Sequence, residues 1–340
     1  MTMMVIRPIR ESDQEAFEKF AMAAGTGVTS LPKNSTLLRK KIIRSIASFA
    51  SQEPPGEGLY IFVLQDVETG ELGGTAAVDA KTLGSEDGYF FRVEELVHPK
   101  SKLPMPKHIR ILQPIQRRTF ASEVGGLYLL PKFRQGGLGK LLSLSRFLFI
   151  AGFAERFHTT IISEMRGRIE KNNTSPFWDA VGKNFLNLPF PRMLAEIAMD
   201  HSIIPKIMPQ FPIYISLLPL AAQRAIGKTH KNTKAALKML LSEGFLPTTE
   251  VDIFDGGPKL SAQTSQIRSI ANSKTGVIRT ISIQPPDGAR AIISNENIDY
   301  RATFGTLKEH EEDGTVSIHH DLASILDVRQ GDTIRYVVKG

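Results

Sequence analysis

The chain has 340 residues, a hydrophobic fraction of 41% and a charged fraction of 23%, which is typical of a globular protein and excludes a small stapled scaffold. It contains no cysteine, so disulfide frameworks, thiolate metal sites and cysteine nucleophiles are excluded, and a reducing compartment fits. The formal net charge of +7 favours an anionic partner, such as a nucleic acid, a membrane surface or a phosphate-bearing cofactor.

The sequence gives no sign of export or membrane insertion. The N-terminal residues contain no apolar run long enough for a secretory signal. The longest uncharged stretch, Ile207–Gln223, is interrupted by three prolines and falls short of the ~20 apolar residues of a spanning helix. We therefore expect a cytoplasmic protein without a membrane partner.

The first part of the chain predicts a strand, two helices and two antiparallel strands. Ser12 and Glu15 have the spacing of a capping box, which marks the start of the first helix. In chain order, we predict a strand Met3–Arg7, a helix from Ser12 to Ala24, a helix after Ser35, and paired strands Tyr60–Leu64 and Gly73–Val78.

Positive charge is concentrated between Leu96 and Ser122, where no acidic residue occurs. Prolines in this stretch predict an inserted loop with short extended pieces, within a basic insertion that spans residues 81–122. A solvated loop, an anion-contacting loop and a nucleic-acid footprint are three interpretations, and the lack of interleaved aromatic residues disfavours the third. The cations are Lys100, Lys102, Lys107, Arg110, Arg117 and Arg118.

A glycine-rich turn follows the next apolar strand, Glu123–Leu130. Gly125 and Gly126 interrupt that strand, and glycines there often mark a bulge or the close approach of a ligand. The turn itself, Arg134–Lys140, leads into a long helix with one apolar face. Main-chain N–H groups at such a helix start bind anions, and the helix dipole favours negative charge there.

The pattern Arg-x-x-Gly-x-Gly in this turn resembles the acyl-CoA-binding motif of the GNAT-type N-acyltransferases. The resemblance implies that the turn binds the CoA pyrophosphate and that the preceding strand binds the pantetheine arm and the thioester. The cofactor-binding residues predicted on this basis are Leu127, Leu129, Arg134, Gly137, Gly139 and Lys140.

The rest of the chain completes a mixed α/β (α+β) fold. We predict a GNAT-like acyltransferase core over residues 1–258 and a small C-terminal β module over residues 259–340. The core elements expected are a strand Thr159–Met165, a helix from Ser175-Pro176, a helix from Thr233 to Glu243 and a strand Val251–Phe254. The β segments expected are Val277–Ile283, Ala289–Ser294, Tyr300–Gly305, Thr315–His319 and Thr333–Val338.

Several short segments resemble one subfamily, the arginine N-succinyltransferases, far more closely than GNAT proteins in general. They occur in order along nearly the whole chain. The matching segments are Gly27–Pro32, Arg92–Val93, Leu96–His98, Ser145–Phe147, Glu164–Gly167, Ser175–Trp178, Met208–Pro209, Pro212–Tyr214, His230, Asp252–Pro258 and Asn295–Asn297.

The resemblance implies transfer of a succinyl group from succinyl-CoA to the α-amino group of L-arginine. It implies that His230 is the proton donor, whereas the local sequence alone would make it a surface or capping histidine. It also implies a homo-oligomer, or a hetero-oligomer with a related subunit. Leu130 departs from the family, which carries an acid before the proline, so the preference for the acyl chain stays open.

The two substrates need opposite charges at their ends. Paired carboxylates suit a guanidinium, and cations suit the carboxylates of the succinyl group and of the amino acid. Within the matching segments, the predicted substrate-binding residues are Ser30, Arg92, Glu164, Arg166, Asp252 and Glu296, with Arg146 and Asp255 as further charged candidates. Each can equally be a solvated or structural residue.

Two further interpretations stay open, and a metal site is not expected. The same fold can act on ornithine or on another amine or acyl-CoA, and a non-catalytic nucleic-acid-binding relative is the alternative from another class. Neither His98 nor the pair His319-His320 has a third metal-ligating residue at the spacing of a known metal motif. Without a cysteine, direct attack of the amine on the thioester is the simplest scheme.

Overall fold

The structure is a computed structural model of the whole chain, and it describes residues 3–54, 56–80, 87–97, 108–118 and 120–338. The N-terminal elements have the predicted order. They are β1 (Met4–Pro8), α1 (Gln14–Ala24), α2 (Ser35–Ala50), β2 (Leu59–Asp66) and β3 (Leu72–Asp79). The three strands are antiparallel neighbours, and α1 and α2 bury apolar side chains against one face of them.

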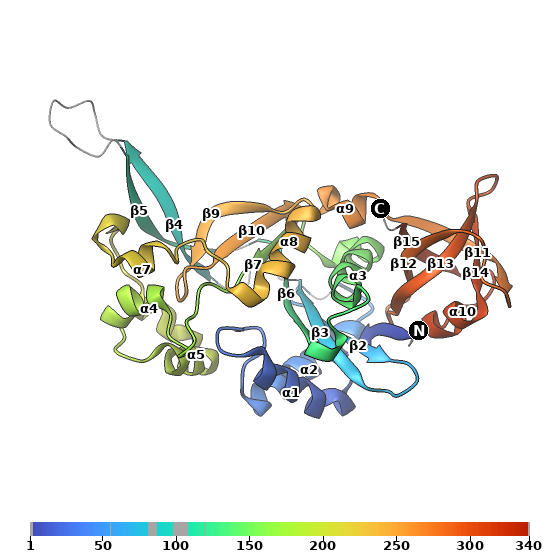
Figure 1. Cartoon of the computed structure of the whole chain (residues 1–340), viewed down its shortest axis with the longest axis horizontal. Coiled ribbons are helices and arrows are strands. Elements are labelled where there is room, and N and C mark those ends of the chain that lie inside the picture. Colours follow the sequence, from blue (N-terminus) through green and yellow to red (C-terminus); the bar gives the residue numbers. More distant parts are fainter. Residues whose placement is uncertain (1–2, 55, 81–86, 98–107, 119, 339–340) are drawn as a thin grey trace.

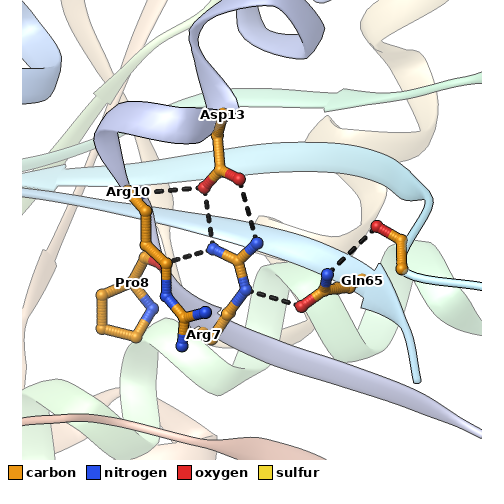
Figure 2. A network of polar contacts seen from close by, with 6 residues as sticks. Arg7, Pro8, Arg10, Asp13 and Gln65 are labelled. Atoms are coloured by element: carbon orange, nitrogen blue, oxygen red, sulfur yellow. Dashed lines mark hydrogen bonds and ion pairs between the residues drawn. The ribbon is translucent and has the colours of Figure 1, made fainter.

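A buried ion pair joins β1 to the start of α1 (Figure 2). Arg7 donates from Nη1 and Nη2 to the two carboxylate oxygens of Asp13 at 2.7 and 3.0 Å. Its Nε donates to Oε1 of Gln65 on β2 at 2.7 Å, and Asp13 also accepts from the main-chain N–H of Arg10 at 2.8 Å. Both charged groups are thus hydrogen-bonded as well as paired, which offsets their loss of water.

The centre of the sheet contains one parallel pair, and this pair separates along its length. The strands are β6 (Ser122–Leu129) and β7 (Thr160–Glu164), connected through α3 (Leu138–Gly152). Only Ser122 and Glu123 of β6 are paired with β7 among the described residues. The rest of β6 pairs with β3 on its other side, so the sheet opens between the two strands.

The second half of the core continues beyond β7. In space, the order is β7, β10 (Pro258–Gln263) and β9 (Leu246–Asp252), all antiparallel neighbours. Helix α8 (Lys234–Ser242) precedes β9, and its Leu240 packs in the same apolar cluster as Phe147 of α3. With the opened parallel pair at its centre, this topology confirms the predicted mixed α/β fold class.

The basic insertion is more ordered than its sequence suggested. Its described part forms a hairpin of β4 (Asp87–Val97) and β5 (His108–Arg118), each 11 residues long and paired along their whole length. The expectation of a loop with short extended pieces is therefore wrong for these residues. Pro114 is tolerated because the other neighbour of β5 is only the two-residue strand β8 (Ile213–Tyr214). Residues 98–107, including Lys100, Lys102 and Lys107, lie outside the described residues.

Four short helices lie between β7 and α8. They are α4 (Pro176–Ala180), α5 (Phe190–Met199), α6 (Ile204–Ile207) and α7 (Leu220–Gln223). The side chain of Ser175 accepts from the main-chain N–H of Trp178 and so caps α4, as its Ser-Pro start predicted. Trp178 itself is buried in an apolar cluster with residues of α5.

The C-terminal strands form a closed five-stranded barrel, and α10 (His320–Leu326) packs on it. The strands are β11 (Lys274–Ser282), β12 (Ala289–Asn295), β13 (Ala302–His310), β14 (Thr315–His319) and β15 (Thr333–Val338). The ring runs β12-β15-β11-β14-β13 and closes through pairing of β12 with β13. A short helix, α9 (Arg268–Ala271), connects β10 to the barrel. The boundary at residue 258 stays a prediction.

The barrel is joined to the core through a strand and through buried side chains. Ile6 of β1 pairs with Ala302 of β13, and Thr303 donates from its hydroxyl to the main-chain oxygen of Met4 at 2.6 Å. The hydroxyl of Tyr300 donates to the carbonyl oxygen of Ser145 on α3 at 2.7 Å. Figure 1 shows the barrel at one end of an elongated molecule and the hairpin of β4 and β5 at the other. Within the described ranges, no helix has both the length and the apolar character needed to cross a membrane.

Candidate active site

The strand predicted to bind the acyl chain carries a bulge where it leaves β7. Gly126 has a φ of 61°, which favours glycine, and the register with β3 shifts between Thr75 and Ala77. Ser163 of β7 donates from its hydroxyl to the carbonyl oxygen of Val124 at 3.0 Å, at the point where the strands separate. The predicted cofactor residues Leu127 and Leu129 follow the bulge, and both are at least partly buried.

Arg146, on α3, hydrogen-bonds to the main chain of β3 and of β6 at this bulge. Its Nη1 donates to the carbonyl oxygens of Ala77 and Gly125, both at 3.2 Å, and its Nε donates to the carbonyl oxygen of Ser143. Complete burial lowers the pKa of Arg146 to about 9. Because its guanidinium is occupied by main-chain oxygens, we do not retain Arg146 as a ligand for a substrate carboxylate.

The glycine turn has the geometry expected of an anion-binding helix start. Gly137 is the N-cap of α3 with a φ of 81°, and Gly136 has a φ of 62°. Gly139 and Lys140 belong to the first turn of α3, a helix of 15 residues. Arg134 donates from Nε to the carbonyl oxygen of Leu129 at 2.8 Å, which ties the turn to the end of β6. The turn can therefore present main-chain N–H groups to a diphosphate.

His230 lies just before α8 and is held by the main chain that follows β7. The main-chain N–H of His230 donates to the carbonyl oxygen of Arg166 at 2.8 Å, and the neighbouring Thr229 forms a β-bridge with Gly167. The side chain is buried, with His230 only 7% exposed. Its Nδ1 accepts from the main-chain N–H of Asn232 at 3.2 Å, so the hydrogen-bonding pattern assigns the proton of the neutral ring to Nε2.

The imidazole of His230 is kept neutral by its surroundings. Burial lowers its pKa, and the positive charges of Arg166 and Lys231 lower it further, to about 4. A solvent-exposed imidazole has a pKa of about 6.5, so the lowered pKa of His230 comes from the fold. A negative charge bound beside Arg166 reduces the repulsion and raises the pKa again.

Arg166 is a half-buried cation with few partners. Its Nη1 reaches the carbonyl oxygen of Ala24 at 3.5 Å, and its Nε has no hydrogen-bond partner. Burial lowers its pKa, while attraction to Asp255 opposes this shift. Among the described residues, four buried side-chain N or O atoms lack a partner, and two of them, Nε of Arg166 and Oγ1 of Thr229, lie beside His230. A buried polar atom without a partner is rare, and an ordered water, an ion or a catalytic role are among its explanations.

The loop between α1 and α2 covers Arg166. A Cβ atom at Gly27 would lie 2.4 Å from Cδ1 of Ile169 and 3.1 Å from Nε of Arg166, and Gly27 has a φ of 86°. Glycine is therefore required for this close approach. Ser30 lies on the same loop and is partly buried. The structure thus brings the loop of Ser30, Arg166 and His230 together.

Two acids stabilise the main chain around Arg166 and His230. Asp255 accepts from the N–H groups of Gly167 and Gly257 at 2.7 and 2.8 Å. Asp252 accepts through Oδ1 from the N–H groups of Phe254 and Asp255 at 2.7 and 2.8 Å. Burial and the charge of Asp255 raise the pKa of Asp252 to about 8, and burial raises that of Asp255. Because Oδ1 of Asp252 already accepts from two main-chain N–H groups, a role of Asp252 as a guanidinium ligand stays a prediction.

Three other predicted substrate residues lie in different surroundings. Glu164 ends β7, two residues before Arg166, and is exposed. Arg92 lies on β4 and pairs with Glu94 at 2.7 Å, on an exposed part of the hairpin. Glu296 forms two hydrogen bonds to Arg335 of the barrel at 2.9 and 3.1 Å and contacts the opposite end of α3, at Gly152. The structure therefore does not bring Glu296 together with the glycine turn, and we remove it from the site.

The histidines of the barrel form a small cluster with an acid. His319, His320 and Asp321 have ligand atoms within 4.8 Å of one another. His319 uses both ring nitrogens, since Nε2 contacts the carbonyl oxygen of Ile283 at 2.7 Å and Nδ1 accepts from the N–H of Asp321 at 3.3 Å. The cluster is thus explained as a helix cap, and the expectation of no metal stays a prediction. His98 lies outside the described residues.

Comparisons with known proteins are consistent along the whole chain. Residues 4–269 match the family described as arginine N-succinyltransferase beta subunit, and residues 274–338 match its C-terminal domain. Proteins named arginine N-succinyltransferase from Salmonella paratyphi B and Salmonella newport are 34% identical over 98% of this chain and 97% of theirs.

A solved structure agrees with the same assignment. Arginine/ornithine succinyltransferase subunit AI from Pseudomonas aeruginosa is 34% identical, with a TM-score of 0.89 over 100% of both chains. The matching segments, the opened strand pair and the glycine turn all point in the same direction. The chain belongs to the arginine N-succinyltransferase family of acyltransferases.

Proposed function

We propose that the chain transfers the succinyl group of succinyl-CoA to the α-amino group of L-arginine. The observation that carries the proposal is the placement of His230 and Arg166 beside each other, at the end of β7, in a chain that belongs to this family. The full-length likeness to proteins named arginine N-succinyltransferase supports the choice of both substrates.

Succinyl-CoA lies along the opened strand pair. Its diphosphate binds to the N–H groups at the start of α3, and Gly137 and Gly139 leave room for it. Its pantetheine arm follows β6 at Leu127 and Leu129, where the main chain is not paired with β7. Arg134 and Lys140 supply positive charge near the phosphates.

Arg166 binds a substrate carboxylate. Among the described residues its guanidinium makes one long hydrogen bond, through Nη1, so Nη2 is left to donate to a carboxylate, whereas the unpaired Nε is enclosed. Ser30, on the loop above it, supplies a further hydroxyl. Glu164 is the acid closest in the chain to this group and is the remaining candidate for the guanidinium of the substrate. Arg92 stays a candidate for the other carboxylate.

The reaction needs one proton to move from nitrogen to sulfur. The neutral amine attacks the thioester carbon, a C–N bond forms, and the C–S bond breaks as the carbonyl is restored. The nitrogen loses one proton and the departing sulfur gains one. In the proposal, the protonated imidazole of His230 donates the proton that the sulfur gains, and the proton that the nitrogen loses returns to the imidazole through water. Pairing of Arg166 with a substrate carboxylate raises the pKa of His230, so that the ring carries a proton to donate.

Thiol release from succinyl-CoA, followed in the presence of a panel of amines, tests the proposal. We expect turnover with L-arginine, slower turnover when acetyl-CoA replaces succinyl-CoA, and a large loss of kcat with little change in KM for His230→Ala. Undiminished turnover of His230→Ala would remove this residue from the mechanism. Ornithine is the second amine to include, because the Pseudomonas aeruginosa structure is named for both amino acids.

Two further properties belong to the proposal. An assembly with copies of itself or with a related subunit is supported by the naming of the Pseudomonas aeruginosa protein as a subunit, and a mass measurement in solution tests it. A cytoplasmic location is supported by the proposed substrate, because CoA thioesters are made and used inside cells. The nucleic-acid interpretation gains no support from the family assignment.

A further inference from the structure

A cavity of about 360 Å³ lies between the acyltransferase core and the C-terminal barrel. Its walls come from α3 and α9 on one side and from β12, β13 and β15 on the other. The volume is within the range of ~300–1,000 Å³ that is common for small-molecule sites. Of the residues that line it, only Lys140 has a part in the proposed binding of the diphosphate.

The cavity begins where the glycine turn ends. Phe304 of β13 lines it, and ring atoms of Phe304 lie 3.6 and 3.7 Å from the position of a Cβ atom on Gly137. Lys140, in the first turn of α3, lines it as well. A molecule whose diphosphate lies at the start of α3 can therefore extend directly into the cavity.

The charges that line the cavity favour an anion. Lys140, Arg268 and Lys274 contribute positive charge. Lys274 is paired with Glu309 at 2.8 Å, whereas Arg268 has no ion pair among the described residues. The one acid that lines the cavity, Glu243, is buried and accepts from the main-chain N–H of Ser269 at 2.7 Å. Arg268 is therefore the cation best able to meet a phosphate.

The rest of the lining suits a flat apolar group. Ile292, Phe304, Val337 and the ring of Tyr336 supply apolar surface, and Asn272 supplies an amide beside it. A purine has flat faces that pack on apolar side chains and edges that hydrogen-bond. The chemistry thus matches a nucleotide that carries a phosphate besides its diphosphate.

We infer that this cavity binds the 3′-phosphoadenosine end of the acyl-CoA, with Arg268 on the 3′-phosphate. The inference rests on the proposed use of an acyl-CoA, and it gives the C-terminal barrel a role as one wall of the cofactor site. The attachment of the barrel to the core through β1, Tyr300 and Thr303 keeps this wall in place.

Arg268→Ala tests the inference, with Arg329→Ala as the matched control. Arg329 is an exposed arginine between α10 and β15 that does not line the cavity. A hydrogen bond to a charged group contributes roughly 1.5–3 kcal/mol, so Arg268→Ala should lower kcat/KM for succinyl-CoA by about 10- to 100-fold. The rate with succinyl-pantetheine, which has no nucleotide, should be unchanged, and Arg268→Lys should recover part of the loss.

Equal effects on the two thioesters, or no effect on either, would overturn the inference while leaving the proposed function intact. Absence of turnover in the unaltered protein would instead contradict the proposed function. Calorimetry with adenosine 3′,5′-bisphosphate separates the two cases, because it requires no transfer. Binding that is lost in Arg268→Ala and kept in Arg329→Ala supports the inference, and binding that is absent or equal in all three proteins contradicts it.

Discussion

The main-chain N–H of His230 donates to the carbonyl oxygen of Arg166 at 2.8 Å, and this contact joins the segment before α8 to the segment after β7. It holds the imidazole near a guanidinium whose charge helps to lower the pKa of His230 to about 4. The acid of the proposed reaction and the proposed carboxylate ligand are therefore electrostatically linked. Binding of a carboxylate to Arg166 therefore changes the protonation of His230.

Replacement of Arg166 should raise the pKa of His230 part of the way to its ordinary value. In Arg166→Gln, the pKa of His230 should rise from about 4 towards its ordinary value, because one of the two neighbouring positive charges is gone. Burial remains, so the return should be incomplete. Histidine ring signals followed by NMR across a pH titration measure the change. Arg168→Gln is the control, since Arg168 is exposed and pairs with Glu170; an equal shift in both variants would contradict the link.

Gly137→Ala should weaken binding of succinyl-CoA by at least about 10-fold, because a Cβ atom at the start of α3 obstructs the approach of the diphosphate. The variant also pays a backbone penalty of roughly 1–2 kcal/mol, since Gly137 has a φ of 81°. Gly314→Ala isolates that penalty, because Gly314 has a φ of 68° and open space around it. If both variants lose stability equally and neither loses affinity, the turn is only structural.

The pair of Arg7 and Asp13 should be necessary for stability. Both residues are buried, so Asp13→Asn leaves an uncompensated guanidinium and should lower the free energy of unfolding by about 3–5 kcal/mol. Urea unfolding measures this loss. Glu15→Gln breaks an exposed pair with Lys19 and should leave stability nearly unchanged, because solvent screens such pairs. A small effect of Asp13→Asn would show that water reaches the pair.

Asp252 should make the protein less stable as the pH rises towards 8. Its pKa is raised to about 8, so the folded state retains a proton that the unfolded state has already lost above its ordinary pKa near 4. The free energy of unfolding should therefore fall between pH 5 and pH 8 and then level off. Asp252→Asn, which is neutral at every pH, should lose this slope in urea titrations. An unchanged slope would assign it to another group.

Local patterns predicted the parts of the fold that depend on neighbouring residues. The strand glycines and the glycine turn identified the bulge at Gly126 and the start of α3. The capping box of Ser12 and Glu15 is wrong, because α1 begins at Gln14 without a side-chain cap, and the local acid that accepts from the main chain is Asp13, from the N–H of Arg10. The hairpin of β4 and β5 was missed because prolines and clustered cations resemble a loop, whereas the strands are stabilised by pairing with each other and with β9. Strand β10 and helix α10 were missed as well.

The electrostatics of the site could not be read from the chain. Arg166 and His230 are separated by 64 positions in the sequence, and only the fold places them in contact. Asp255 was one of several acids in a matching segment, and nothing local indicated that it accepts from the N–H groups of Gly167 and Gly257. Glu296 was misplaced for the same reason, because its partner Arg335 is known only from the folded barrel.

The identity of the product tests the central claim most directly. The purified chain is incubated with succinyl-CoA and L-arginine, and the product is analysed by NMR for the position of the new amide. The account predicts succinyl on the α-nitrogen, in an amount equal to the free CoA released, and almost none with His230→Ala. Hydrolysis of succinyl-CoA without an amide, or an amide on the guanidino group, would contradict it.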